Sequence, residues 1–374
     1  MKAVGVRHAP IEVRLPADDR FAADMLEGLV RIESLSGQER AASEWLVAVM
    51  RGLGLRAHVD EAGSAVGITG DDSPDAKELV LLGHIDTVPG RVPVRREGDL
   101  LFGRGTVDAK GPLAAFVMAA ATAKLGPGVR VVVIGAVEEE AATSKGARLA
   151  ATQYRPAACI IGEPSGADGV TLGYKGRLLA ELSVTRAGAH SAGPQGSAAD
   201  VAIEWWSRVC LWASEATDGA SRVFDQVQCS VRSMTTSSDG MADSARLVAG
   251  FRLPLEVSPQ EVEAACLAAA AALGEGIQVT FRGHELAHAS DRSDPVVALL
   301  SAAIRDGGAT PRPKLKTGTS DMNVVAPIWK CPIAAYGPGD SSLDHTPNEH
   351  ISISEYLRSI QVLRRAVEGF GSAM

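Results

Sequence analysis

Cysteine and aromatic residues are both scarce in this chain. Its five cysteines among 374 residues are scattered and form no CxxC pair, so neither a thiolate zinc site nor a disulfide framework is indicated. This use of cysteine is typical of a protein in the reducing cytoplasm. Aromatic residues make up only 4% of the chain, whereas Ala, Val, Leu and Gly are abundant. That composition favours an α/β protein whose helices pack closely against a sheet.

The chain also lacks a basic excess, a signal peptide and a membrane-spanning segment. Its net charge of −8 argues against a nucleic-acid-binding protein. Residues 1–20 carry charges throughout without an apolar core, which is unlike a signal peptide. The segment closest to a membrane span, Leu113–Ala123, is far too short to cross a bilayer. We therefore expect a cytoplasmic protein that binds neither nucleic acid nor membrane.

Two domains are predicted from the length and from a change of pattern along the chain. A chain of 374 residues exceeds what one simple core usually holds. Apolar strands and helices alternate as far as residue 173, whereas residues 174–289 combine strand-like segments with two helices at 198–213 and 260–273. We expect an α/β domain, with a mixed central sheet flanked by helices, from residues 1–173 and 290–374. The α+β segment 174–289 would interrupt it, and the role of residues 1–18 stays open.

The stretch GHIDTVP at residues 83–89 follows the apolar run Leu79–Leu82, which predicts a buried strand. His84 and Asp86 are two residues apart and point to the same side of a strand end. A histidine that binds a metal needs its other ring nitrogen held, most often by a carboxylate, and Asp86 fits that role. Taken alone, the pair is also compatible with an ordinary polar strand end.

The pattern Ser36-Gly37-Gln38-Glu39 predicts the start of a helix. Its Ser and Glu are spaced as in a capping box, in which the two side chains satisfy the first free amides of a helix. We expect this helix to run to Met50 and to end at Gly52–Gly54.

Acidic residues follow two further predicted strands. Glu138-Glu139-Glu140 come directly after the β-branched strand Val131–Val137, and Glu163 follows the short apolar strand 159–162. Adjacent carboxylates repel one another, and a metal ion or a raised pKa relieves this repulsion.

Asp108 and His345 occupy comparable positions. Asp108 lies in a glycine-rich loop before the predicted helix Leu113–Lys124, which Pro112 would open as its first residue. His345 follows the apolar stretch 331–336 and a Gly-Pro-Gly loop. Ligand sites in open α/β sheets lie at the carboxyl ends of the strands. Two imidazoles and several carboxylates at one such edge suit a pair of zinc ions that share a bridging carboxylate.

The ordered set GHIDTVP, GRGTVDAKG, EEE, GEPS, GAHSAGP and DHTPNE resembles the co-catalytic zinc amidohydrolases. These enzymes include aminoacylase, acetylornithine deacetylase, succinyl-diaminopimelate desuccinylase and glutamate carboxypeptidases. The resemblance covers nearly the whole chain from Asp19 onward. It implies a zinc-peptidase-like catalytic domain, an inserted dimerisation or lid domain at 174–289, and a homodimer.

The resemblance also implies two zinc ions per subunit, with Co²⁺ as a possible replacement. One zinc would be held by His84 and Glu163, and the other by Glu140 and His345. Asp108 would bridge the two ions.

Glu139 is the general base that the resemblance implies, and Asp86 would orient His84. The family usually has Asp-Glu-Glu where this chain has Glu138-Glu139-Glu140, so a neighbouring glutamate is an alternative base. The peptide bond after Asp108 is typically cis in such enzymes.

Residues of the substrate site follow from the same resemblance. His190, in the Ala-His-Ser motif of the inserted domain, would reach into the partner subunit's active site and stabilise the oxyanion. Arg252 matches an arginine that holds the substrate carboxylate. The substrate-lining loop would comprise Gly318, Thr319 and Ser320.

A closer resemblance, carried by residues 88–96, 137–143 and 169–177, is to the LysW-lysine and LysW-ornithine hydrolases. These enzymes release lysine or ornithine from a small acidic amino-group carrier protein. They cut the amide between the γ-carboxyl group of its C-terminal glutamate and the α-amino group of the amino acid. A basic rim in an otherwise acidic protein would steer such a carrier. We expect this rim to contain Arg91, Arg95, Arg96, Lys175 and Arg177, with Arg104 and Lys110 nearby.

Two alternatives stay open at this point. Within the enzyme class, the alternative is a small-molecule N-acyl-amino-acid deacylase of the acetylornithine deacetylase or succinyl-diaminopimelate desuccinylase type, or a dipeptidase. A metal-free binding or scaffold protein of the same fold is an alternative from another class. The sequence does not decide between lysine and ornithine.

Overall fold

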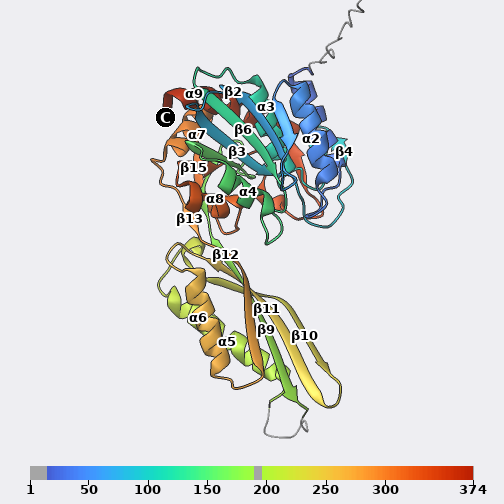
Figure 1. The fold of residues 1–374 in the computed structure, drawn as a ribbon, viewed down its shortest axis with the longest axis vertical. Helices are drawn as coiled ribbons and strands as arrows, with labels where there is room; N and C mark the ends of the chain where they lie inside the picture. The colour runs from blue at the N-terminus through green and yellow to red at the C-terminus, as the bar shows by residue number, and fades with distance from the viewer. Residues whose placement is uncertain (1–14, 189–195, 374) are drawn as a thin grey trace, which may run out of the picture.

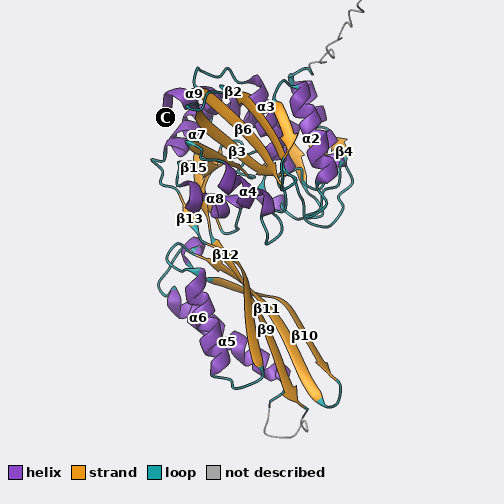
Figure 2. Cartoon of the chain, viewed as in Figure 1, coloured by secondary structure: helices purple, strands orange, loops and turns teal. Residues whose placement is uncertain are grey.

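The computed structural model describes residues 15–188 and 196–373 and places them in two regions (Figure 1). One region is built around a nine-stranded sheet and the other around a four-stranded sheet. Figure 2 shows helices on both sides of the larger sheet and on one side of the smaller one. His190 lies outside the described residues. No helix within the described ranges is long and apolar enough to cross a membrane.

The larger sheet has the strand order β1-β2-β6-β3-β7-β15-β8-β13, and β14 also pairs with β8. Its middle strands β6, β3, β7 and β15 run parallel to one another, whereas β2 is antiparallel to β6 and β8 is antiparallel to β15. The predicted α/β class with a mixed central sheet is therefore confirmed. The strands are β1 (Arg56–Val59), β2 (Ala65–Gly70), β3 (Lys77–His84), β6 (Val129–Ala136), β7 (Ala158–Gly162), β8 (Gly169–Tyr174), β13 (His288–Ala289), β14 (Arg312–Lys316) and β15 (Ile333–Ala335).

Alternate residues of each central strand enter different hydrophobic layers. Leu79 and Leu81 of β3 pack with helices α1, α2, α3, α7 and α9 on one face, and Val80 and Leu82 pack with α4 and α8 on the other. Both faces are covered, so the middle residues of the central strands are apolar on both sides. The helices are α1 (Asp19–Arg31), α2 (Arg40–Gly52), α3 (Lys110–Thr122), α4 (Lys145–Gln153), α7 (Pro295–Asp306), α8 (Asp321–Trp329) and α9 (Ile353–Ala373).

The smaller sheet is antiparallel throughout, with the order β10-β11-β9-β12. Its buried face packs on two helices around Trp205 and Phe251, and its strands β9 and β11 alternate between buried and more exposed residues. The elements are β9 (Gly176–Ala187), α5 (Ala198–Ala216), the 3₁₀ turn η1 (Val223–Asp225), β10 (Gln228–Ser238), β11 (Ala242–Leu253), α6 (Pro259–Ala271) and β12 (Ile277–Glu285).

Several local features differ from the sequence-based prediction. Helix α3 begins at Lys110, so Pro112 is its third residue rather than its first. Helix α8 was not predicted, because Pro327 interrupts the sequence pattern inside it. A three-stranded sheet was also missed; it contains β4 (Arg95–Glu97), β5 (Leu100–Phe102) and β16 (His350–Ser352), and the short turn η2 (Ser341–Leu343) precedes β16.

The predicted capping box at Ser36 and Glu39 is wrong. Helix α2 begins at Arg40, and its N-cap residue Glu39 makes no side-chain capping bond. The Glu39 carboxylate accepts hydrogen bonds from the amides of Gly37 and Glu138, and the Ser36 hydroxyl donates to Asp86 Oδ2. Both side chains therefore stabilise the loops of the candidate site instead of a helix end.

Candidate metal centre

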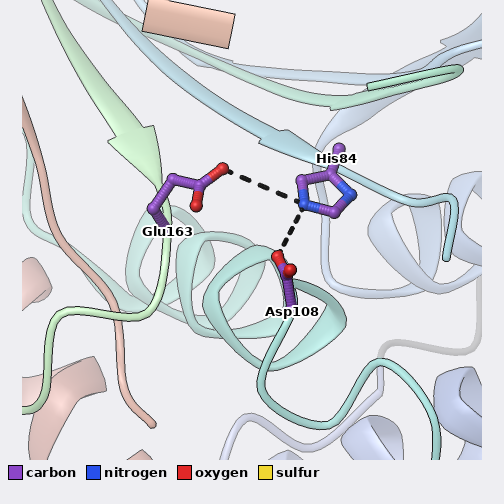
Figure 3. A group of neighbouring side chains, drawn as sticks. All are labelled: His84, Asp108 and Glu163. Carbon is purple, nitrogen blue, oxygen red and sulfur yellow. Dashed lines mark hydrogen bonds and ion pairs between the residues drawn. The ribbon is translucent and has the colours of Figure 1, made fainter. Parts of the chain in front are cut away.

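Three potential metal ligands meet at the carboxyl edge of the larger sheet (Figure 3). His84 ends β3, Asp108 precedes α3, and Glu163 follows β7. His84 Nε2 lies 3.1 Å from Asp108 Oδ1 and 3.9 Å from Glu163 Oε1. His84 is 1% exposed, so its ring nitrogen faces the carboxylates and not solvent.

A second group of ligands shares Asp108 with the first. His345 Nε2 lies 3.0 Å from Asp108 Oδ2 and 2.9 Å from Glu140 Oε1. The donor atoms within each group lie within 4.8 Å of one another. Asp108 thus offers one carboxylate oxygen to each group, as a carboxylate that bridges two metal ions would.

Parallel strand pairing is what brings these residues together. In the sheet register His84 of β3 pairs with Ala136 of β6, and Gly83 pairs with Gly162 of β7. The residues that follow β6 and β7, among them Glu140 and Glu163, therefore emerge beside His84.

Asp86 has a wider role than the one predicted for it. His84 Nδ1 lies 3.1 Å from the main-chain oxygen of Asp86 and 3.5 Å from its Oδ1. If Nδ1 carries the proton in these contacts, Nε2 keeps the lone pair that a metal needs. The Asp86 carboxylate also accepts hydrogen bonds from the amides of Glu139 and Glu140, at 3.1 and 3.0 Å. It therefore positions the loop that carries both glutamates.

Glu349 is a positioning residue that the sequence analysis missed. Its fully buried carboxylate accepts hydrogen bonds from the amides of Gly105, Val107 and Asp108, and Arg104 Nη1 donates to it at 2.6 Å. The Asp108–Ala109 peptide bond in this loop is cis, as the resemblance implied. Glu349 is the last residue of the DHTPNE motif, which was the available signal in the sequence. The motif does not reveal which loop the Glu349 carboxylate holds.

The cationic side chains around the site do not balance the negative charge of its carboxyl groups. Burial, with Asp108 adding to it, raises the pKa of Glu163 to about 8. Burial also raises the pKa of Glu139 well above its usual range. For Asp108 burial works in the same direction, but hydrogen bonds from His345 and His84 outweigh it and lower the pKa. Divalent cations would supply the missing charge, and the imidazole and carboxylate donors fit zinc or a similar metal.

A pocket of about 630 Å³ opens beside these ligands. Asp108, Glu139, Glu140, Glu163 and His345 line one part of it. The other part is basic and polar, and it contains Arg177, Arg232, Arg252, Lys314, Lys316, Gly318 and Thr319.

Of the predicted substrate residues, three line the pocket and one does not. Arg252 Nη1 donates to Thr319 Oγ1 at 2.6 Å, and both residues line the pocket with Gly318. Ser320 is buried and caps α8, with its hydroxyl accepting from the amide of Met322, so it does not line the pocket as predicted.

Most of the predicted basic rim is engaged within the protein. Lys175 is fully buried and its ammonium donates to the carbonyl oxygens of Val223 and Gln226, which corrects its prediction as an exposed steering residue. Arg96 pairs with Asp24 and Glu27, Arg95 pairs with Glu97, and Lys110 and Arg104 are hydrogen-bonded inside the structure. Arg177 pairs with Glu285 but lines the pocket, and the exposed Arg91 lines an adjoining cavity of about 460 Å³.

Two imidazoles and a shared carboxylate at the edge of a mixed α/β sheet form a candidate site for divalent cations. The chain belongs to peptidase family M20/M25/M40, which matches residues 80–369.

Known proteins resemble the chain over nearly its whole length. A LysW-lysine hydrolase of Deinococcus radiodurans is 46% identical over 358 residues, which cover 94% of this chain and 97% of the relative. A LysW-lysine/LysW-ornithine hydrolase of Sulfurisphaera tokodaii is 30% identical, with coverage of 93% and 95%. The solved structure of an M20 family metallo-carboxypeptidase from Sulfolobus solfataricus has a TM-score of 0.77 at 18% identity, with coverage of 93% and 98%. That last likeness shows the shared fold.

Proposed function

We propose that this protein hydrolyses the amide that joins lysine or ornithine to the C-terminal glutamate of a small acidic carrier protein, in amino-acid biosynthesis in the cytoplasm. The observation that carries the proposal is the pocket, where a metal-ligand cluster faces a wall of arginine and lysine side chains. An acidic substrate needs such a wall. The 46% identical relative carries the name of this activity.

The metal ligands are assigned as two groups that share Asp108. His84, Asp108 and Glu163 would hold one divalent cation, and Asp108, Glu140 and His345 would hold the other, with Zn²⁺ favoured by the donors. Bound cations supply Lewis acidity, which polarises the amide carbonyl group and acidifies a water molecule.

Glu139 is our choice of general base among the three consecutive glutamates. Glu138 accepts a hydrogen bond from the Thr143 hydroxyl at 2.6 Å, and Glu140 contacts His345. Glu139 lines the pocket, and its Oε2 lies 4.0 Å from His84 Nε2. Its carboxylate would accept a proton from the attacking water and pass it to the leaving α-amino nitrogen as the C–N bond breaks.

Arg252 and Thr319 would hold the carboxylate of the departing amino acid. The guanidinium group is a good partner for a carboxylate because it donates two parallel hydrogen bonds. The oxyanion role of His190 stays a prediction.

We also propose a homodimer that forms through the smaller sheet. Strand β10 is an edge strand of that sheet, and its residues from Ser230 to Ser238 are exposed. Val231 and Met234 on this strand are 43% and 38% exposed. A long edge strand with exposed apolar residues is a natural surface for pairing with another chain.

Turnover of carrier-linked lysine by the wild type and by Glu139→Gln tests the proposal. We expect the wild type to release free lysine and the variant to lose about 10²- to 10⁴-fold in kcat, because general-base catalysis contributes on that order. The variant should keep its bound metal, because Glu139 belongs to neither ligand group.

Acetylornithine is the comparison substrate in this assay. Hydrolysis of acetylornithine without hydrolysis of carrier-linked lysine would refute the proposal in favour of a small-molecule deacylase. Undiminished activity of Glu139→Gln would refute the assigned base, and absence of bound metal with no rescue by Zn²⁺ or Co²⁺ would support a scaffold protein.

A further inference from the structure

The basic wall of the pocket contains two separate groups of cations. Arg177, Arg232 and Arg252 come from neighbouring strands β9, β10 and β11 of the smaller sheet. Lys314 and Lys316 come from β14, which belongs to the larger sheet. Two groups of cations from different sheets therefore line the same pocket as the metal-ligand cluster.

The arginine group holds more positive charge than its neighbours balance. Arg177 Nε donates to Glu285 Oε2 at 3.1 Å, whereas Arg252 donates to the uncharged hydroxyl of Thr319. Arg232 makes no hydrogen bond or ion pair with a residue in the described ranges. Burial, together with the nearby Arg177 and Arg232, lowers the pKa of Arg252. An anion bound among these guanidinium groups would relieve their repulsion.

One lysine of the second group has no direct partner among the described residues, although its charge lies near the carboxyl groups of Glu163 and Asp344. Lys314 Nζ donates to the carbonyl oxygen of Ser165 at 2.7 Å. Lys316 Nζ lies 5.9 Å from the centre of the Tyr174 ring and has no hydrogen bond or ion pair within the described part of the chain. Lys316 is only half-buried on β14, so its ammonium group is available to a ligand in the pocket.

The chemistry of the proposed substrate explains why two groups are present. A γ-linked glutamate keeps its own α-carboxylate free, and the attached amino acid keeps another, so a carboxylate lies on each side of the scissile amide. Two carboxylates repel each other, and separate cationic groups allow both to bind at a distance from one another.

We propose that Lys316, with Lys314 beside it, binds the carboxylate on the acyl side of the scissile amide. Arg252 and Arg232 bind the carboxylate of the departing amino acid. This inference rests on the proposed function, and it extends that function by naming the substrate class as amides with a free carboxylate on both sides. Lys316 is thus a specificity-determining residue.

Two small substrates that differ in one group test the inference. Nα-glutaryl-lysine carries a carboxylate at the end of its acyl chain, as many bonds from the amide as the α-carboxylate of a γ-linked glutamate. Nα-pentanoyl-lysine has a methyl group in its place. We expect the metal-loaded wild type to favour the glutaryl substrate about 10-fold or more in kcat/KM, since a charge-assisted hydrogen bond has that worth.

Lys316→Met should reduce this preference about 10-fold, mainly through KM, and Lys316→Arg should restore most of it. The matched control is Arg312→Met, which removes a charge from the same strand at a residue that does not line the pocket and should keep the wild-type preference. Equal loss on both substrates in Lys316→Met would overturn the inference, because a lysine that only balances the acidic ligands affects both alike. A wild type without preference for the glutaryl substrate, including one that cleaves neither, would overturn it too.

Failure of the inference differs from failure of the proposed function. The proposed function fails when carrier-linked lysine is not hydrolysed by the wild type. The inference fails when the ratio of the two small substrates does not depend on Lys316, whatever happens to the carrier.

Discussion

The two sheets of this protein differ in the relative direction of their strands, in how far helices cover their faces, and in the residues that they contribute to the pocket. In β3 of the larger sheet the residues from Leu79 to His84 are all buried, whereas β9 of the smaller sheet alternates between buried and partly exposed residues. Parallel strands covered on both faces end at a common edge, where polar residues after each strand gather. The larger sheet and its loops therefore supply the candidate metal ligands and the proposed base, while the smaller, antiparallel sheet supplies arginines from three adjacent strands.

The largest effect is expected where the chemistry is concentrated, at Asp108. Asp108→Ala removes the residue that both ligand groups share, so we expect metal content to fall and carrier-linked lysine turnover to drop more than about 10³-fold. Metal analysis and a turnover assay measure this. Asp306→Ala, an exposed change at the end of α7, is the control and should alter neither. Wild-type activity in Asp108→Ala would show that the ligand groups at the edge of the larger sheet are not needed for the reaction.

A core substitution in each region tests whether the regions fold as separate units. Trp205 is fully buried under the smaller sheet and donates its indole N–H to the carbonyl oxygen of Cys266. Trp205→Ala should cost about 3–5 kcal/mol in the unfolding of that region, from lost burial and a cavity. Phe116→Ala in α3 is the counterpart in the larger region.

Urea unfolding followed by far-UV circular dichroism measures both variants. We expect Trp205→Ala to lower the urea midpoint of one unfolding transition and Phe116→Ala to lower the midpoint of the other. The division at residues 173 and 289 stays a prediction until this is done. A single transition that both variants lower equally would contradict two independent domains.

A smaller effect is expected where the second sheet meets the substrate. Arg252→Met should raise KM for carrier-linked lysine about 10- to 100-fold, because a charge-assisted hydrogen bond to the carboxylate is lost. Arg252→Lys should recover part of it. Steady-state kinetics measure the change, with Arg246→Met as the control, since Arg246 lies on the same strand and pairs with Glu181 outside the pocket. A lower kcat at unchanged KM would count against a binding role.

The smallest effect concerns Lys175, just before β9. Burial, with Arg252 adding to it, lowers the pKa of Lys175 to about 8 from its ordinary value of 10.5. Between these values the unfolded chain holds the proton and the folded protein does not, so the contribution of Lys175 to stability rises with pH, by at most about 1.4 kcal/mol per pH unit.

The difference in unfolding free energy between wild type and Lys175→Met, measured in urea at pH 7 and pH 9, tests this. We expect the difference to shift in favour of the wild type at pH 9. A difference that does not change with pH would mean that Lys175 keeps its proton when buried.

Much of the candidate site was predictable because local patterns mark strand ends. His84, Glu163 and the run 138–140 each follow a strongly apolar segment, and parallel strands must end together. The meeting of His84, Asp108 and Glu163 was therefore expected, and the structure brings them together. Their role as metal ligands stays a prediction.

Other members of the site carried no local signal. Lys314 and Lys316 lie in a short edge strand, and Arg232 lies on β10, where the register shifts between Val231 and Ser233. Nothing in their neighbours along the chain shows that these three side chains line one pocket. The prediction for Lys175 was wrong for the same reason. A lysine in a loop sequence is usually exposed, and only the fold buries this one.

The sequence by itself determined the apolar strands, the order of the elements and the chemical identity of the residues at strand ends, because these depend on periodicity and on neighbours along the chain. Tertiary structure alone decided that Ser36 and Glu39 serve the site rather than a helix cap, and that Glu349 holds the Asp108 loop 241 residues away. It also decided which cations reach the pocket. Such contacts depend on how distant segments pack, and packing joins residues whose separation along the chain carries no pattern.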